Sequence, residues 1–152
     1  MIIIKSHKEF ESYTGKELGV SNWHLITQEQ IDKFADATLD KQWIHTDPER
    51  AKIDSPFKAT IAHGYLILSL IPFFWKQIVD VQNIKMEVNY GIEQLKFGQA
   101  VVVGSEVRCR VFLTSIVNLR GVSKATKYIQ LEIKGQPKHA FTANVLFLYH
   151  FM

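Results

Sequence analysis

The chain has only one cysteine among its 152 residues, so it cannot form an internal disulfide. It needs none for stability, because 47% of its residues are hydrophobic, which is ample for the core of a domain of this length. Cys109 stands in the alternating run Val107–Val111, and we expect it to be a buried strand thiol rather than a reactive one.

Blocks of like charge are also absent. The net charge of +3 is spread along the chain, and no run rich in Lys and Arg is interleaved with aromatic residues, so nucleic acid is not expected as a partner. A mild positive balance still suits a phosphate-bearing acyl carrier. The apolar run within Met1–Lys5 is too short for a signal peptide and follows no basic residues, which predicts a cytoplasmic protein.

The chain lacks internal repeats, low-complexity segments and any Pro/Gly/Ser linker long enough to separate domains, so we expect a single domain over residues 1–152. Thr27 followed three residues later by Gln30 resembles a capping box and predicts a helix over residues 28–37, with short strands before it between residues 15 and 26. Asp47 and Pro48 indicate the start of a short helix that runs through Ala51. Residues 38–47 are then a connection between two helices.

The longest apolar stretch begins at Gly64 and runs to about Val81. It is apolar on every face, which predicts a buried helix with a kink at Pro72. A membrane span is the competing interpretation, but Lys76 and Asp80 interrupt the stretch near its expected end.

After Val81 the hydrophobic period changes to two, which is typical of strands. Apolar residues alternate along four segments, at about 86–97, 101–111, 129–133 and 141–151. In the second of these, Val101 and Val103 are expected on the same strand face as Cys109. The simplest way to bury both parts is an antiparallel sheet wrapped around the long helix, an α+β architecture.

Asp40 and His45 are the first candidates for chemistry. On one continuous helix they would point about 140° apart, since each residue turns roughly 100°. The predicted break between the two helices lets them face one pocket, where a carboxylate and an imidazole can hold and activate water. Taken alone, the pair is more often a set of solvated surface groups.

Gly64 strengthens that interpretation because it stands at the start of the apolar helix. A free amide there can receive an oxyanion, such as the developing enolate of a thioester, and glycine permits close approach. The alternative is that Gly64 merely begins the helix. For His63, a buried and hydrogen-bonded side chain is the favoured interpretation over a direct role.

Two motifs together resemble the MaoC-like family, which includes the (R)-specific enoyl-CoA hydratases. They are Asp-x-x-x-x-His-x-Asp-Pro at residues 40–48 and Ile-Ala-His-Gly at residues 61–64, and Asn-Tyr-Gly at 89–91 followed by Lys96-Phe97 also resembles that family. The amino-acid sequence around residues 42–51 and 60–66 is most similar to the nodulation protein N branch of this family. The resemblance covers about residues 28–112.

The resemblance implies a hot-dog fold, a homodimer whose sheets join edge to edge, and an acyl thioester of coenzyme A or acyl carrier protein as substrate, with no cofactor and no metal. Asp40 and His45 match the catalytic residues, which bind the water added across the 2,3 double bond or removed from the 3-hydroxyacyl chain. Which of the two moves each proton is left open. Gly64 matches the oxyanion donor, and the substrate-binding candidates are Gln42, Trp43, His63 and Tyr65.

The chain departs from the family pattern in three places. Leu39 stands where glycine usually precedes the catalytic Asp, and it would be strained if that position requires a positive φ. Gln42 and Trp43 replace an Asn-Pro pair, which makes the substrate less certain than the reaction. Lys96 replaces a common arginine, so the charge is kept but the bidentate fork is lost.

Three other functions compete. A hot-dog thioesterase needs a carboxylate on or beside the central helix, and since none lies between Gly64 and Val79, Glu87 or Glu93 would have to serve from the strand region. Leu39 is the best support for a noncatalytic acyl-thioester-binding protein, whereas the presence of Asp40, His45 and Gly64 together argues against it. A metal site formed by His45, Asp47 and His63 is weaker still, because nothing in the sequence fixes their geometry.

Overall fold

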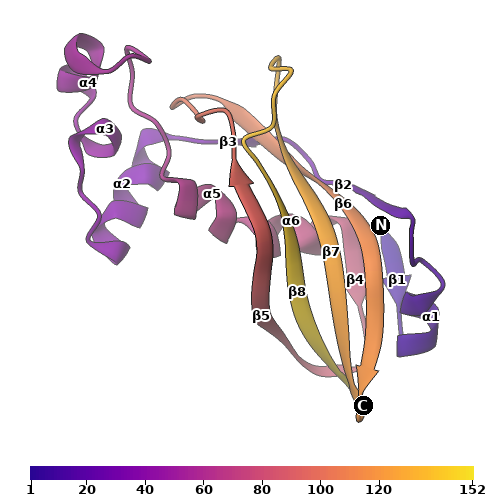
Figure 1. Cartoon of the computed structure of the whole chain (residues 1–152). Helices are drawn as coiled ribbons and strands as arrows, with labels where there is room; N and C mark the ends of the chain where they lie inside the picture. Colours follow the sequence, from indigo (N-terminus) through magenta and orange to yellow (C-terminus); the bar gives the residue numbers. More distant parts are fainter.

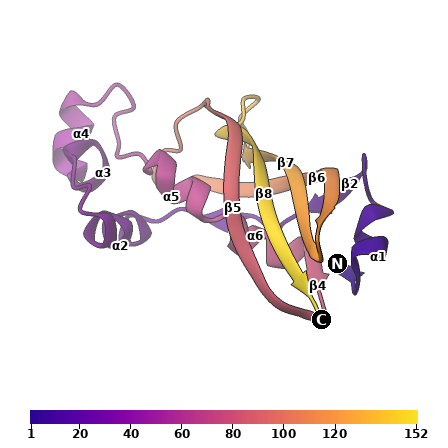
Figure 2. The same ribbon diagram turned by 60° about the horizontal axis from the view of Figure 1, so that its bottom comes forward.

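The computed structural model describes all residues, 1–152, and its main feature is one curved antiparallel sheet (Figure 1). The strands follow the order β2-β6-β7-β8-β5, and β3 pairs with β6 next to β2. Their bounds are β2 Glu17–Val20, β3 His24–Leu25, β5 Ile84–Phe97, β6 Glu106–Leu119, β7 Val122–Ile133 and β8 Phe141–Phe151. Helices α5 (Gly64–Ser69) and α6 (Ile71–Ile78) lie across one face of this sheet (Figure 2). The hot-dog architecture expected from the sequence is therefore confirmed.

The central helix differs from its prediction in two ways. It is interrupted at Leu70, because Pro72 has no N–H to continue the hydrogen-bonded ladder and instead occupies the first turn of α6. It also ends at Ile78 rather than Val81, since Val79–Val81 form a strand, β4, that pairs in parallel with β1 (Ile2–Ile4). No helix in the structure is long and apolar enough to span a bilayer.

The central helix is not buried on every face, as its composition had suggested. Phe74, Trp75 and Ile78 are buried against the sheet. In contrast, Tyr65 is 68% exposed and Phe73 is 49% exposed. The prediction of all-round burial was wrong for this single chain, and the helix carries an uncovered apolar side.

The alternation predicted for the strands is confirmed in β6, β7 and β8. In β7 every second residue from Ser123 to Ile133 is buried, and the buried residues of β8 include Phe141 and Tyr149. The expectation that Val101 and Val103 share a strand with Cys109 was wrong, because the chain turns at Gly104, whose φ is 86°, before β6 begins. The short strands expected between residues 15 and 26 are β2 and β3. Helix α1 (His7–Glu11) and strand β1 had no clear signal in the sequence.

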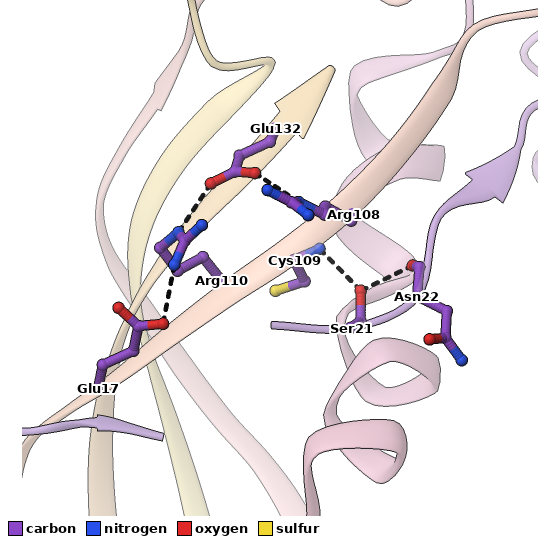
Figure 3. A network of polar contacts seen from close by, with 7 residues as sticks. All are labelled: Glu17, Ser21, Asn22, Arg108, Cys109, Arg110 and Glu132. Atoms are coloured by element: carbon purple, nitrogen blue, oxygen red, sulfur yellow. Dashed lines mark hydrogen bonds and ion pairs between the residues drawn. The ribbon is translucent and has the colours of Figure 1, made fainter. Parts of the chain in front are cut away.

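Polar contacts join strands β2, β6 and β7 of the sheet (Figure 3). The carboxylate of Glu132 accepts hydrogen bonds from Arg108 (2.6 Å) and Arg110 (2.8 Å), and Arg110 also reaches Glu17 on β2 at 2.8 Å. The backbone amide of Cys109 donates to the Ser21 hydroxyl at 2.9 Å. The thiol of Cys109 is buried as predicted, and burial raises its pKa to about 12.

Lys127 is an unusual member of the core because its side chain is fully buried. Its Nζ lies 3.5 Å from the ring centroids of both Trp75 and Phe147, and it donates to the Tyr149 hydroxyl at 2.9 Å. That hydroxyl donates in turn to Glu87 on β5 at 3.1 Å. Burial lowers the pKa of Lys127 well below its ordinary value, against the opposing effect of the Glu87 charge.

Candidate active site

The candidate site is built around a segment that begins with helix α2 (Gln28–Thr38). This segment lies to one side of the sheet (Figure 1). The Thr27 hydroxyl caps this helix by accepting from the Gln30 amide at 3.1 Å, so the predicted helix start is confirmed. The helix ends because Leu39 adopts a left-handed conformation, with φ 65° and ψ 12°. Leu39 therefore does occupy a position that favours glycine, and the strain anticipated from the sequence is present.

The break predicted between Asp40 and His45 is also present. A short helix that the sequence did not indicate, α3 (Trp43–Thr46), carries His45. The next helix, α4 (Pro48–Asp54), starts at the predicted residue, with the Asp47 carboxylate accepting from the Arg50 amide at 3.0 Å. It runs three residues past the predicted end at Ala51. The separate helices let Asp40 and His45 turn toward the same space.

Asp40 and His45 come together with His63, which lies 18 residues farther along the chain than His45. One nitrogen or carboxylate oxygen from each lies within 4.8 Å of the others. The His45 Nδ1–H donates to the carbonyl of Ile61 at 2.7 Å, because a carbonyl can only accept. In neutral His45 the lone pair is therefore on Nε2, which makes this nitrogen available as a base.

The surroundings of His45 favour its neutral form. Burial is the largest influence and lowers its pKa, and the neighbouring His63 lowers it further. The hydrogen bond to the Ile61 carbonyl and the charge of Asp40 act in the opposite direction without reversing the shift. His45 therefore keeps its basic lone pair down to pH values at which an exposed histidine would already be protonated.

His63 is only 2% exposed, so the favoured interpretation of a buried, hydrogen-bonded histidine is confirmed. Its Nε2 lies 2.9 Å from the backbone carbonyl of Asp40, and its ring stacks on that of His45 with centroids 3.8 Å apart and planes at 23°. The phenyl ring of Phe34 packs against it from helix α2 at 4.9 Å. His63 is therefore held by contacts with Asp40, His45 and Phe34.

Gly64 begins helix α5, and its amide donates to no other group of the protein. A Cβ at this position would meet two ring carbons of Phe97 at 2.9 Å. The absence of a side chain therefore lets Phe97 pack over the start of the helix.

A cavity of about 410 Å³ connects these groups. Five of the seven residues predicted for the site line it, namely Asp40, His45, His63, Gly64 and Tyr65. The rest of its wall is formed by Ile61, Ala62, Ile67, Phe97, Gly98, Gln99, Ala100, Val101 and Ala140. The residues from 97 to 101 and Ala140 carried no sequence signal for this site, because only the fold brings them beside α5.

The other two predicted residues lie outside this cavity. Gln42 precedes α3, where its carbonyl accepts from the His45 amide at 3.0 Å. Trp43 packs beneath Arg50, whose guanidinium carbon is 4.4 Å from the ring centroid. Lys96 lies on β5, exposed and away from the cavity wall.

The residues required by the competing functions are placed elsewhere. Neither Glu87 nor Glu93 lines the cavity, and Glu87 instead accepts from the Tyr149 hydroxyl. Asp47 of the alternative metal site caps α4. A second cavity, of about 500 Å³ between the central helix and β5, is lined by no carboxylate or imidazole. Of these two cavities, only the first is lined by carboxylate and imidazole groups.

Comparison with known proteins identifies the family of the chain. A model of the MaoC-like domain matches residues 9–133. The 3-hydroxyacyl-thioester dehydratase Z of Mycobacterium tuberculosis is 39% identical over 98% of this chain and 99% of its own. Nodulation protein N of Rhizobium leguminosarum is 41% identical over 92% of this chain and 88% of its own. The two identities are nearly equal, so they do not separate the nodulation protein N branch from the dehydratase.

Solved structures give the same fold. The R-hydratase PhaJ1 of Pseudomonas aeruginosa superposes with a TM-score of 0.75 at 17% identity, over 96% of this chain and 86% of that one. The (R)-hydratase of A. caviae, described as involved in PHA biosynthesis, superposes with a TM-score of 0.69 at 25% identity, over 88% of this chain and 96% of that one. Sequence motifs, fold and relatives agree, and the chain belongs to the MaoC-like dehydratase family.

Proposed function

We propose that this protein interconverts trans-2-enoyl thioesters and (R)-3-hydroxyacyl thioesters by adding or removing water. The observation that carries the proposal is that Asp40, His45 and the unpaired amide of Gly64 line one cavity with largely apolar walls. The names of the relatives support it, since one is a 3-hydroxyacyl-thioester dehydratase and another is an (R)-hydratase.

In the hydration direction, water binds between the Asp40 carboxylate and Nε2 of His45. Nε2 takes one proton as the water oxygen bonds to C3, while Asp40 holds the second hydrogen and orients the attack. The 2,3 double bond moves toward the carbonyl, and the Gly64 amide stabilises the enolate oxygen. Return of the proton to C2 restores His45, so that one water is added and no net proton is consumed.

The apolar wall gives the acyl chain its place. Ile67, Val101 and Ala140 line the cavity together with the catalytic groups and offer no charge to the substrate. Tyr65, exposed beside Phe97, is our candidate for contact with the thioester end, which carries coenzyme A or acyl carrier protein. For Gln42 and Trp43 a substrate contact stays a prediction.

The test is hydration of a trans-2-enoyl-CoA, followed by loss of absorbance of the conjugated thioester. We expect Asp40→Asn and His45→Gln each to reduce kcat by about 100-fold or more, the usual scale for a positioned acid or base. Asp54→Asn and His150→Gln are matched controls outside the cavity and should keep wild-type activity. An active wild type whose site variants turn over as fast as these controls would refute the assigned roles, and a folded but inactive wild type would favour the noncatalytic binding protein.

We also propose that the protein is a homodimer joined at strand β5. One edge of β5 pairs with β8, whereas the other edge pairs with no strand. Exposed apolar side chains occur along it, including Met86, Tyr90 and Ile92. An open strand edge with exposed apolar residues favours pairing with another chain.

Sedimentation measurements test this assembly. We expect the wild type to have about twice the chain mass of 17.5 kDa. Ile92→Lys should shift it toward the monomer, whereas Ile53→Lys on the distant, exposed helix α4 should not. A monomeric wild type would refute the proposal.

A further inference from the structure

We propose that His63 is a positioning residue, which fixes Asp40 and His45 relative to the amide of Gly64 without itself moving a proton. The inference rests on the proposed function of the cavity. His63 directly precedes Gly64 and is the N-cap residue of helix α5. Its ring therefore has a fixed relation to the glycine amide through the backbone.

The contact with Asp40 is the first support. The His63 Nε2–H donates to the Asp40 carbonyl at 2.9 Å. The structure shows no other hydrogen bond to Asp40, whose side chain is exposed at the cavity and whose chain neighbour Leu39 is in a left-handed conformation. One bond from His63 thus anchors the link between α2 and α3 at the residue that presents the carboxylate.

The contact with His45 is the second support. The two imidazole rings stack at 3.8 Å, and His45 Nδ1 is bonded to Ile61, only two residues before His63. Phe34 packs against the His63 ring from α2. The His45 ring is therefore held in its plane by the same short segment that provides the Gly64 amide.

The protonation state follows from these partners. Since Nε2 donates to a carbonyl, the neutral ring carries its lone pair on Nδ1. Nδ1 is buried and has no hydrogen-bond partner. A proton on Nδ1 would be a buried N–H without an acceptor among the protein's groups, so these contacts favour the Nε2–H tautomer and give His63 no partner to which it could pass a proton.

A pair of substitutions separates positioning from packing. His63→Gln keeps an amide donor near the position of Nε2, whereas His63→Asn places its donor near Nδ1 and cannot reach the Asp40 carbonyl. Both remove the stacked ring, so a loss of melting temperature common to both reports packing alone. The difference between them reports the bond to Asp40.

We expect His63→Asn to lower kcat for enoyl-CoA hydration about 10- to 100-fold, the effect of a displacement near 1 Å, with KM changed by less than about threefold. His63→Gln should recover most of the lost kcat. Equal kcat in the two folded variants, or a loss confined to KM, would overturn the inference. An inactive wild type would instead contradict the proposed function itself.

A measurement on the wild type requires neither variant to fold. Nitrogen NMR of protein labelled with ¹⁵N-histidine distinguishes protonated from unprotonated ring nitrogens. We expect opposite tautomers, with the proton on Nε2 in His63 and on Nδ1 in His45. A His63 protonated on Nδ1, or on both nitrogens at neutral pH, would overturn the inference whatever the activity.

Discussion

The left-handed residue before Asp40 offers a sharp test of the local geometry. Leu39 has φ 65° and its side chain is 80% exposed, so it makes few contacts that could offset the backbone strain. A residue with a Cβ costs roughly 1–2 kcal/mol more than glycine in this conformation. The extra freedom of glycine in the unfolded chain offsets about 0.5–1 kcal/mol of that difference.

Leu39→Ala and Leu39→Gly form the matched pair for this prediction. Both remove the same exposed side chain, but only glycine relieves the strain. We expect Leu39→Gly to be more stable than Leu39→Ala by about 0.75 kcal/mol, the middle of the range of about 0–1.5 kcal/mol that those two effects leave. This difference corresponds to a melting temperature about 1.5–3 °C higher for a chain of this size. The measurement is urea and thermal unfolding at equal protein concentration. A glycine variant less stable than the alanine variant would show that Leu39 is not strained.

Three further predictions concern charged groups. Because burial lowers the pKa of His45 from its ordinary value of 6.5, the acidic limb of the kcat/KM profile should lie below pH 6.5, and a limb above pH 6.5 would contradict this. The free energy of unfolding should also fall as pH decreases through 6.5, since His45 binds a proton more readily in the unfolded chain. Glu132→Gln should lower the free energy of unfolding in urea by about 1–3 kcal/mol, because it breaks the half-buried ion pairs with Arg108 and Arg110. Glu106→Gln breaks a more exposed pair with Lys134 and should cost less than about 1 kcal/mol. Equal costs for the two variants would refute the reasoning. Lys127→Met should stabilise the protein, and more at pH 7 than at pH 10. The reason is that burial lowers the pKa of Lys127 in the folded chain, so burying this residue costs more free energy as pH falls below its pKa in the unfolded chain, about 10.4. Destabilisation by Lys127→Met at pH 7 would contradict this.

Local patterns in the sequence predicted most of the sheet and the start of α2. Thr27 and Gln30 mark that helix start, and alternation identifies β7 because its two faces differ in burial. Pro72 indicated a disturbance of the central helix but not where the helix would end. Its end depends on pairing between β4 and β1, whose residues are more than seventy positions apart, and no local pattern reports such a contact.

The candidate site divides in the same way. The motifs named Asp40, His45 and Gly64 as candidates, and the helix signals indicated the break that lets the first two approach each other. The bond from His63 to the Asp40 carbonyl joins residues 23 positions apart, and Phe97 reaches Gly64 from the end of β5. Such contacts follow from the folded backbone, so the sequence could name the chemical groups but not what holds them in place.

The most direct test of the central claim is the fate of a trans-2-enoyl-CoA incubated with the protein in deuterium oxide and followed by NMR. Hydration through Asp40 and His45 should give an (R)-3-hydroxyacyl-CoA that carries one deuterium at C2, a hydroxyl at C3 and an intact thioester. Release of free coenzyme A thiol with an unchanged double bond would identify a thioesterase instead. Recovery of unchanged enoyl-CoA, with no exchange, across short and medium acyl chains would contradict the proposed chemistry.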